Sequence, residues 1–241
     1  MVTISHLNVA FKKKIILNGI DLKVGKGEIF GITGVNGSGK TVLIKVLATL
    51  LRPTGGKVEI AGYDIVKDRN SARSIIGYMP DSVRLDDRLT VKEYLDFFKA
   101  MYGRYREGDG ISSEELLEAI GLHKRDETFL SDLSRGMRQR ILLARAIVHD
   151  PSLLLLDDPD IGMDSDGLEK MHSLLRDLSG KGKTVIFSSH SISLLNRISN
   201  RIGVIHEGRL IWTFPAGVEN VESIQKRIQG LKGGANESST G

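Results

Sequence analysis

One eight-residue segment, residues 34–41, constrains the fold of this chain more than any other feature. It reads Gly-Val-Asn-Gly-Ser-Gly-Lys-Thr, with an apolar strand pattern before it at 28–32 and an apolar helical pattern after it at 42–51. Its three glycines allow a tight turn whose backbone N–H groups point inward, and the following helix adds positive potential at its N-terminus. The segment therefore predicts a phosphate-binding loop between a strand and a helix. The alternative is a glycine-rich turn with no ligand.

The chemistry expected of this loop assigns its side chains. Lys40 would add positive charge beside a polyphosphate, and Thr41 would ligate a magnesium ion. The candidate nucleotide-binding residues here are Gly34, Asn36, Gly37, Ser38, Gly39, Lys40, Thr41 and Val42.

Composition narrows the class of protein. The 241 residues can bury a sizeable core, and 34 Lys and Arg against 30 Asp and Glu give a formal net charge of +4. Basic residues cluster only at 12–14 and 135–140, without the aromatic interleaving typical of nucleic-acid binding. A mildly basic solvated surface is the interpretation we adopt, and no nucleic-acid partner is expected.

The chain has no cysteine, which excludes a disulfide scaffold and is compatible with a reducing cytosol. No segment approaches the roughly 18 uncharged apolar residues of a membrane span, and the N-terminus lacks a basic lead followed by an apolar stretch. We therefore expect the chain to be soluble by itself.

The order of patterns predicts an α/β fold with an added β layer and a helical insertion. Strand patterns occupy 2–9, 15–24, 28–33, 57–60, 153–156 and 184–187, with a helix expected at 168–178. Capping boxes at Thr90/Glu93 and Ser112/Glu115 open two further helices. We expect residues 1–83 and 151–212 to form one discontinuous core, 84–150 a helical subdomain, and 213–241 an extension. Its small polar tail, from Gly233 onward, is expected to be mobile.

Two aspartates follow the apolar strand 153–156, at the sheet edge where ligands bind in open α/β folds. Asp157 would hold magnesium beside Thr41, and Asp158 would polarise a water that attacks a γ-phosphate. The alternative is a pair of helix-capping residues before Pro159.

His190 follows the strand 184–187 and would emerge at the same edge, within reach of a γ-phosphate. Alone, it would more often be a capping or packing histidine.

A second anion-binding helix start is predicted at 133–140, where Ser134 and Gly136 precede an apolar helix and arginines add positive charge. One triphosphate seldom needs two such helix N-termini from one chain. This favours an arrangement in which two copies of the chain face each other. An ordinary capped basic helix is the alternative.

Together, these segments resemble the ATP-binding subunit of an ABC transporter, over nearly the whole chain from Leu7 to about Trp212. The match rests on five ordered motifs: Walker A at 34–41, the family signature at 133–139, Walker B at 153–158, the D-loop start at 160–164 and the switch histidine at His190.

The resemblance implies a P-loop NTPase core, ATP and Mg²⁺ as cofactors, and a head-to-tail dimer. In that dimer the signature of one copy closes over ATP held by the other, with Ser134, Gly136 and Met137 near the neighbour's nucleotide. Phe11 takes the place of the aromatic that stacks on adenine, although a core phenylalanine is the alternative. Lys40, Asp158 and His190 would act in catalysis, and Thr41, Asp157 and Asp81 would lie at the metal.

Four positions depart from the family pattern. Asp81 stands where the Q-loop glutamine is usual, Arg135 where glycine is usual and Met137 where glutamine is usual. These variants favour the branch that serves polytopic exporter subunits. Asp158 replaces the usual catalytic glutamate, and its shorter reach, by about 1.5 Å, predicts slow or partner-dependent hydrolysis.

The leading hypothesis is an ATPase subunit at the cytoplasmic face of the cell membrane that drives export through a separate permease. Asp81 and the loop 82–88 would meet that permease. One alternative is a soluble ABC-type switch without a membrane partner, although such proteins usually carry two cassettes or long coiled coils. Another, compatible with the first, is the weak member of a heterodimer.

Overall fold

The computed structural model describes residues 1–82, 84–103 and 111–233 of the chain. Of the tail expected to be mobile from Gly233 onward, only Gly233 is described, as the last residue of a helix. Residues 234–241 lie outside the described residues, as does Val83 of the expected permease-facing loop.

A six-stranded sheet forms the centre of the molecule. Its strand order is β10-β9-β3-β8-β7-β6, and all neighbours pair in parallel except β10 and β9. The strands are β3 (Ile29–Thr33), β6 (Ile76–Met79), β7 (Leu153–Leu156), β8 (Thr184–Ser188), β9 (Arg201–His206) and β10 (Arg209–Pro215). Every residue of β3, β7 and β8 is buried, which explains why these strands read as continuous apolar runs rather than alternating ones.

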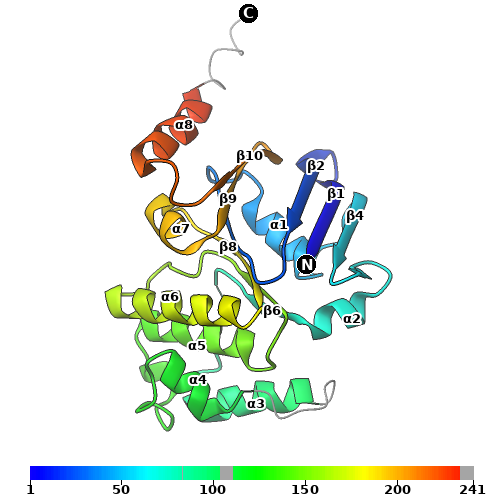
Figure 1. Cartoon of the computed structure of the whole chain (residues 1–241). Coiled ribbons are helices and arrows are strands. Elements are labelled where there is room, and N and C mark those ends of the chain that lie inside the picture. Colours follow the sequence, from blue (N-terminus) through cyan, green and yellow to red (C-terminus); the bar gives the residue numbers. More distant parts are fainter. Residues whose placement is uncertain (83, 104–110, 234–241) are drawn as a thin grey trace, which may run out of the picture.

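A second, antiparallel sheet has the order β2-β1-β4-β5. Its strands are β1 (Val2–Phe11), β2 (Lys14–Val24), β4 (Gly55–Ile60) and β5 (Tyr63–Asp64). In Figure 1 these blue and cyan strands lie to one side of the central sheet, with α1 between. The predicted antiparallel β layer is confirmed, and β4 begins two residues before its expected start.

Helices cover the remaining surfaces (Figure 1). They are α1 (Lys40–Leu47), α2 (Arg69–Ser74), α3 (Val91–Gly103), α4 (Ser113–Ala119), the 3₁₀ turn η1 (Leu130–Asp132), α5 (Arg135–Ile147), α6 (Ser165–Gly180), α7 (Ile192–Ile198) and α8 (Val221–Gly233). None of the described helices is long and apolar enough to cross a membrane.

Both predicted capping boxes are present. Ser112 Oγ accepts from the N–H of Glu115, and the Glu115 carboxylate accepts from the N–H of Ser112, each at 3.0 Å. Thr90 and Glu93 exchange the same pair of bonds, at 3.2 and 2.8 Å. Local sequence therefore sets where α3 and α4 begin.

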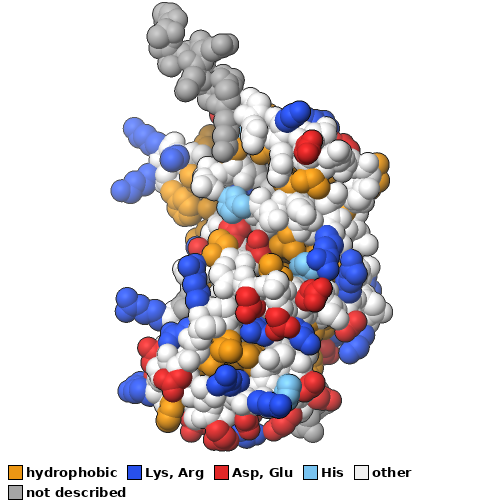
Figure 2. Space-filling model, turned by 90° about the vertical axis from the view of Figure 1, so that its left-hand side faces the viewer, with side chains coloured by type: hydrophobic (Ala, Val, Ile, Leu, Met, Phe, Trp, Pro, Cys, Tyr) orange, Lys and Arg blue, Asp and Glu red, His pale blue; other side chains and the backbone are white. Residues whose placement is uncertain are grey.

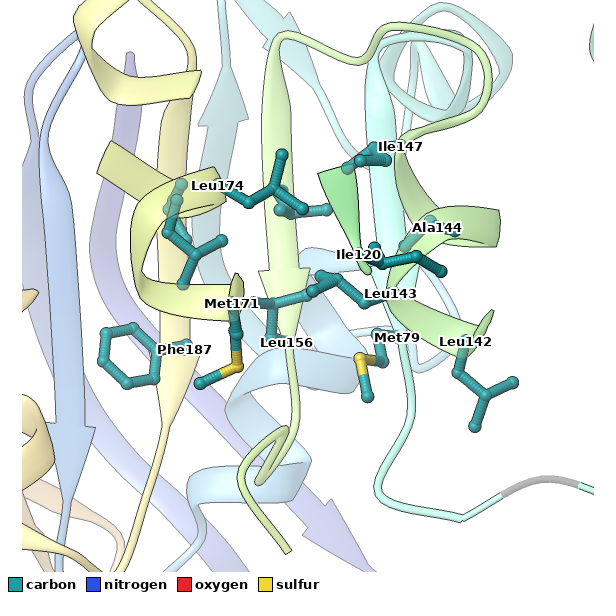
Figure 3. Close-up of a cluster of buried hydrophobic side chains, with 14 of the residues drawn as sticks. Met79, Ile120, Leu142, Leu143, Ala144, Ile147, Leu156, Met171, Leu174 and Phe187 are labelled. Carbon is teal, nitrogen blue, oxygen red and sulfur yellow. The ribbon is translucent and has the colours of Figure 1, made fainter. Parts of the chain in front are cut away.

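Two apolar cores lie on opposite faces of the central sheet. One fills the space between the two sheets and α1, and includes Phe30 and Leu43. The other joins the sheet to α3–α7 and includes Leu156, Phe187 and Met171, which Figure 3 shows between the strands and the neighbouring helices. The sheet is thus held from both sides, which fixes its carboxyl edge where the site forms.

Candidate functional site

The loop between β3 and α1 has the backbone that its glycines predict. Gly34, Gly37 and Gly39 all have positive φ, and Gly39 is the N-cap of α1. At Gly34 the reason is also steric, because a Cβ there would fall on the carbonyl oxygen of Ile205 in β9. The loop therefore wraps around the first turn of α1 against the end of β9.

Lys40 begins α1 and is only 6% exposed. Its Nζ donates hydrogen bonds to the carbonyl oxygens of Gly34, at 3.0 Å, and Val35, at 3.3 Å. Burial lowers the pKa of Lys40, and the negative charges of Asp158 and Asp157 oppose that shift. The ammonium group is thus held inside the loop, beside the two Walker B carboxylates.

Asp157 is fully buried at the end of β7. Its Oδ1 accepts hydrogen bonds from Thr41 Oγ1 at 3.1 Å and Ser188 Oγ at 3.0 Å. Its Oδ2 is buried and has no hydrogen-bond partner. Burial raises the pKa of Asp157, and the two hydroxyl donors oppose the increase. An orphaned carboxylate oxygen beside a threonine hydroxyl is a donor set that suits a magnesium ion.

Asp158 is 8% exposed and has a φ of 47°, in the left-handed region. Its N–H donates to Ser188 Oγ at 2.8 Å, and its Oδ1 is buried without a partner. Its Oδ2 lies 3.7 Å from Nε2 of His190, whose side chain is 47% exposed. Asp158 and His190, each predicted at this edge of the sheet, therefore lie beside each other there.

Asp160 belongs to the same edge, although sequence reasoning gave it no role beyond the D-loop. Its Oδ2 accepts from Ser189 Oγ at 3.0 Å, and burial raises its pKa. The signal for it was its place in the segment Asp-Asp-Pro-Asp at 157–160, directly after the buried strand β7.

Asp81 is exposed after β6, and its Oδ1 accepts from the N–H of the next residue, Ser82, at 2.8 Å. Its charge raises the pKa of Asp157, as the weakest of the contributions to that shift. The described residues contain no group of three or more His, Cys, Asp or Glu side chains arranged to hold a metal.

A cavity of about 410 Å³ opens directly over the loop. It is lined by Lys14, Ile16, residues 36–42, Asp158 and His190. Lys14 and Ile16, from β2, were not predicted. Phe11 does not line the cavity; it is 49% exposed at the end of β1, opposite Lys14 in the pairing.

A second cavity, of about 690 Å³, adjoins the first and shares Asn36, Gly37, Ser38 and His190 with it. Its far wall comes from α8, through Gln225, Ile228, Gln229 and Leu231, and from the β9–β10 turn. On α8, the guanidinium of Arg227 lies 3.6 Å from the centroid of the Trp212 ring and pairs with Glu219 at 2.9 Å. The sequence gave no sign that the C-terminal helix approaches the loop.

The predicted second anion-binding end lies at the start of α5. Ser134 is the N-cap, and its Oγ accepts from the N–H of Met137 at 3.3 Å. Gly136 packs so closely that a Cβ would lie 2.9 Å from the carbonyl oxygen of Gly162. In the described part of the chain, no hydrogen bond or ion pair joins residues 134–137 to residues 34–41, and neither cavity is lined by 134–137.

Comparison with known proteins shows which family this chain belongs to. The sequence profile of the family described as ABC transporter matches residues 17–160. The chain belongs to that family. Among its relatives are the ABC transporter ATP-binding protein NatA of Bacillus subtilis (strain 168), 32% identical with 88% of each chain covered, and the bacitracin transport ATP-binding protein BcrA of Enterococcus faecalis, 37% identical over 86% of this chain. The match spans 66% of the BcrA chain.

Solved structures of ABC ATP-binding subunits have the same fold. One, described as the ATP binding subunit of an ABC transporter, superposes with a TM-score of 0.84 at 22% identity, covering 95% of this chain and 99% of its own. The cassette MJ0796, solved as a dimer in a post-hydrolysis state with ADP and Pi, gives a TM-score of 0.78 at 26% identity over 90% and 99% of the two chains. The predicted fold class and the predicted function as an ABC ATP-binding subunit are confirmed.

Proposed function

We propose that this ABC subunit binds ATP in the cavity over residues 34–41 and hydrolyses it there. The observation that carries the proposal is the gathering of Lys40, Asp157 and Asp158 around one loop, with buried carboxylate oxygens that have no partner in the protein. The loop N–H groups and the N-terminus of α1 would cradle the phosphates.

Thr41 and Asp157 would hold the magnesium ion, which neutralises phosphate charge when bound. Lys40 would exchange its bonds to the loop carbonyls for bonds to phosphate oxygens. Asp158 would orient the attacking water through the oxygen that has no partner, and His190, beside it, would contact the γ-phosphate. Asp81, exposed after β6 and close enough for its charge to raise the pKa of Asp157, is proposed to lie at the metal.

The nucleotide site is proposed to be completed by a second copy of this chain or by a different ATP-binding subunit. Ser134, Gly136 and Met137 form an anion-binding helix start that no bond connects to the loop of the same chain. The similar cassette MJ0796 is a dimer in its ADP and Pi state. A head-to-tail arrangement would place that helix start over the partner's phosphates, with Phe11 stacking on adenine from the same chain's side.

We propose that the subunit works at the cytoplasmic face of the cell membrane, bound to an integral membrane permease, and that it drives export. Support comes from the names of its relatives, which include a bacitracin transport protein and Nod factor export proteins. The exposed Asp81 and the loop that follows it are the proposed contact with the permease. Selectivity for the substrate would reside in the permease.

Hydrolysis is proposed to be slow because Asp158 is shorter by one methylene than the usual glutamate. Its positive φ and its bond to Ser188 hold the backbone in place, so the side chain has little freedom to compensate. If the partner is a cassette with glutamate at this position, the present chain would supply the weaker site.

A pulldown of this chain from detergent-solubilised native membranes tests the proposed assembly. A permease recovered with two copies of the chain would support a homodimeric transporter with Asp158 at work in both sites. A second cassette bearing glutamate would support the heterodimer. Recovery of the chain without any membrane protein would contradict the permease partner and favour the soluble switch.

A further inference from the structure

The turn between β9 and β10 touches the phosphate-binding loop although it belongs to none of the five motifs. Residues 206–209 form a two-residue hairpin in which His206 pairs with Arg209. The central residues, Glu207 and Gly208, both have positive φ, of 46° and 73°. This is the backbone sign pattern of a type I′ turn, which suits the right-handed twist of the two strands.

Gly208 bonds directly to the loop. Its N–H donates a hydrogen bond to the carbonyl oxygen of Ser38, at 3.0 Å. The Ser38 C=O and the Gly39 N–H belong to one planar trans peptide and point in opposite directions. Because Gly208 holds the carbonyl on its side, the Gly39 N–H is turned to the other side, away from Gly208. The orientation of one donor of the predicted phosphate cradle is therefore set from outside the loop.

Gly208 has no room for a side chain where it stands, because β2 lies against it. Its carbonyl oxygen accepts from the N–H of Asn18 at 2.9 Å. A Cβ on Gly208 would fall on the carbonyl oxygen of Ile16 and lie 3.2 Å from the Cα of Leu17. Ile16 itself lines the nucleotide cavity, so Gly208 is wedged between a wall of that cavity and the loop at its floor.

We propose that Gly208 is a positioning residue for the nucleotide: it fixes the Ser38–Gly39 peptide so that the Gly39 N–H points at the polyphosphate. This inference rests on the proposed binding of ATP at residues 34–41 and adds a requirement that the five motifs do not contain. The ligand class it serves is the polyphosphate of Mg-ATP.

The decisive variant is Gly208→Ala, measured by the dissociation constant for Mg-ATP and by the melting temperature without nucleotide. We expect a dissociation constant raised about tenfold or more, because a methyl group must push Gly208 away from Ile16 and so move or break its bond to Ser38. An unchanged affinity in a folded Gly208→Ala protein would overturn the inference.

Gly62→Ala is the matched control. Gly62 stands in the β4–β5 turn with a φ of 88°, and a Cβ there would meet no atom within 4 Å. This variant incurs the same kind of backbone strain without a collision. We expect its melting temperature to fall while its affinity for Mg-ATP stays within about twofold of the wild type. An equal loss of affinity in Gly62→Ala would show that general destabilisation explains the effect, and would overturn the inference.

Gly208→Asn distinguishes the backbone strain of a positive φ from the steric collision of an added Cβ. Asparagine tolerates positive φ better than alanine but carries the same Cβ. We expect it to bind Mg-ATP as weakly as Gly208→Ala, and full affinity in the asparagine variant would contradict the proposal.

Hydrogen exchange of the unmodified protein keeps the inference testable if these variants fail to fold. We expect the Gly208 amide to be protected without nucleotide and to gain protection when Mg-ATP binds, because the loop then holds Ser38 more firmly. A Gly208 amide that exchanges at the same rate with and without saturating Mg-ATP would overturn the inference. Failure of the wild type to bind Mg-ATP at all would instead contradict the proposed function.

Discussion

The carboxyl edge of the central sheet and the start of α5 both offer groups suited to phosphate, but they differ in what completes them. At the sheet edge, Lys40, Asp157 and Asp158 come from distant parts of the chain and meet within one molecule. At α5, Ser134 caps its own helix, and Gly136 packs against Gly162 in the loop between β7 and α6. We propose that the first region is a nearly complete nucleotide site, whereas in the second region Ser134 is exposed and Gly136 is buried against Gly162.

From this difference we infer a division of function between the two regions. The orphaned carboxylate oxygens at the sheet edge suit the proposed metal and attacking water, and we propose that this region binds nucleotide by itself. We propose that the start of α5, which no hydrogen bond or ion pair joins to residues 34–41 in the described part of the chain, reaches phosphate on another subunit. Nucleotide binding should therefore depend on the first region alone, and hydrolysis on both.

Lys40→Ala should cause the largest loss. It removes the charge that lies inside the loop, and we expect the dissociation constant for Mg-ATP to rise about a hundredfold or more. Isothermal titration calorimetry of the variant measures this dissociation constant. Lys45→Ala, in the last turn of the same helix, should bind like the wild type, and unchanged affinity in Lys40→Ala would contradict the assignment of the sheet edge.

Asp158→Glu should raise turnover in saturating ATP by about tenfold or more, because a catalytic group misplaced by about 1 Å costs on the order of a hundredfold in rate. A steady-state phosphate-release assay measures this. The control is Asp160→Glu, which lengthens a neighbouring, partly buried carboxylate that accepts from Ser189 Oγ and should bring no gain. If Asp158→Glu is no faster than the wild type, side-chain reach does not limit the rate.

Ser134→Ala should separate the two regions. We expect hydrolysis to fall about tenfold, since one hydrogen bond to a phosphate is lost, while the affinity of the monomer for nucleotide stays within about twofold. Removing an N-cap also costs about 1 kcal/mol of stability. Ser112→Ala loses the equivalent cap on α4 and should match that stability loss at full activity. Weaker nucleotide binding by monomeric Ser134→Ala would contradict the proposal that nucleotide binding depends on the sheet edge alone.

In the nucleotide-free protein, Asp157→Asn should give the smallest change: a gain in stability, where Ser134→Ala gives a loss. Burial raises the pKa of Asp157, so its charged form destabilises the nucleotide-free fold at neutral pH. The variant should melt higher at pH 7, by about 2–4 °C for each kcal/mol gained, and should lose the stabilisation that Mg-ATP gives. The gain should shrink as the pH falls, because wild-type Asp157 then becomes protonated.

Thermal melts at several pH values measure this difference. Asp177→Asn, at an exposed site on α6, is the control and should leave the melting temperature unchanged at every pH. A variant Asp157→Asn that melts lower than the wild type at pH 7 would show that burial of this charge is not the dominant effect.

The sequence predicted the sheet edge well because its signals are local. Glycine spacing at 34–41, the apolar run before Asp157 and the strand before His190 each place a side chain at the end of a parallel strand. The parallel strands then bring those ends together. The capping residues of α3 and α4 were predicted for the same reason, since each box spans four residues.

Contacts between distant segments were not predicted. Gly208 touches Ser38 across 170 positions of sequence, and α8 forms a cavity wall beside the loop. Lys14 and Ile16 line the nucleotide cavity from an ordinary strand pattern. Nothing in the sequence around these residues distinguishes them, because their roles arise from packing between elements that are far apart in the chain.

The most direct test of the division between the two regions is the molecular mass of the Asp158→Asn variant in solution, measured with saturating ATP and without it. The account predicts that ATP doubles the mass and that adding Ser134→Ala prevents the doubling without reducing nucleotide binding. A chain that binds ATP with full affinity and remains a monomer would contradict a site completed by a second copy.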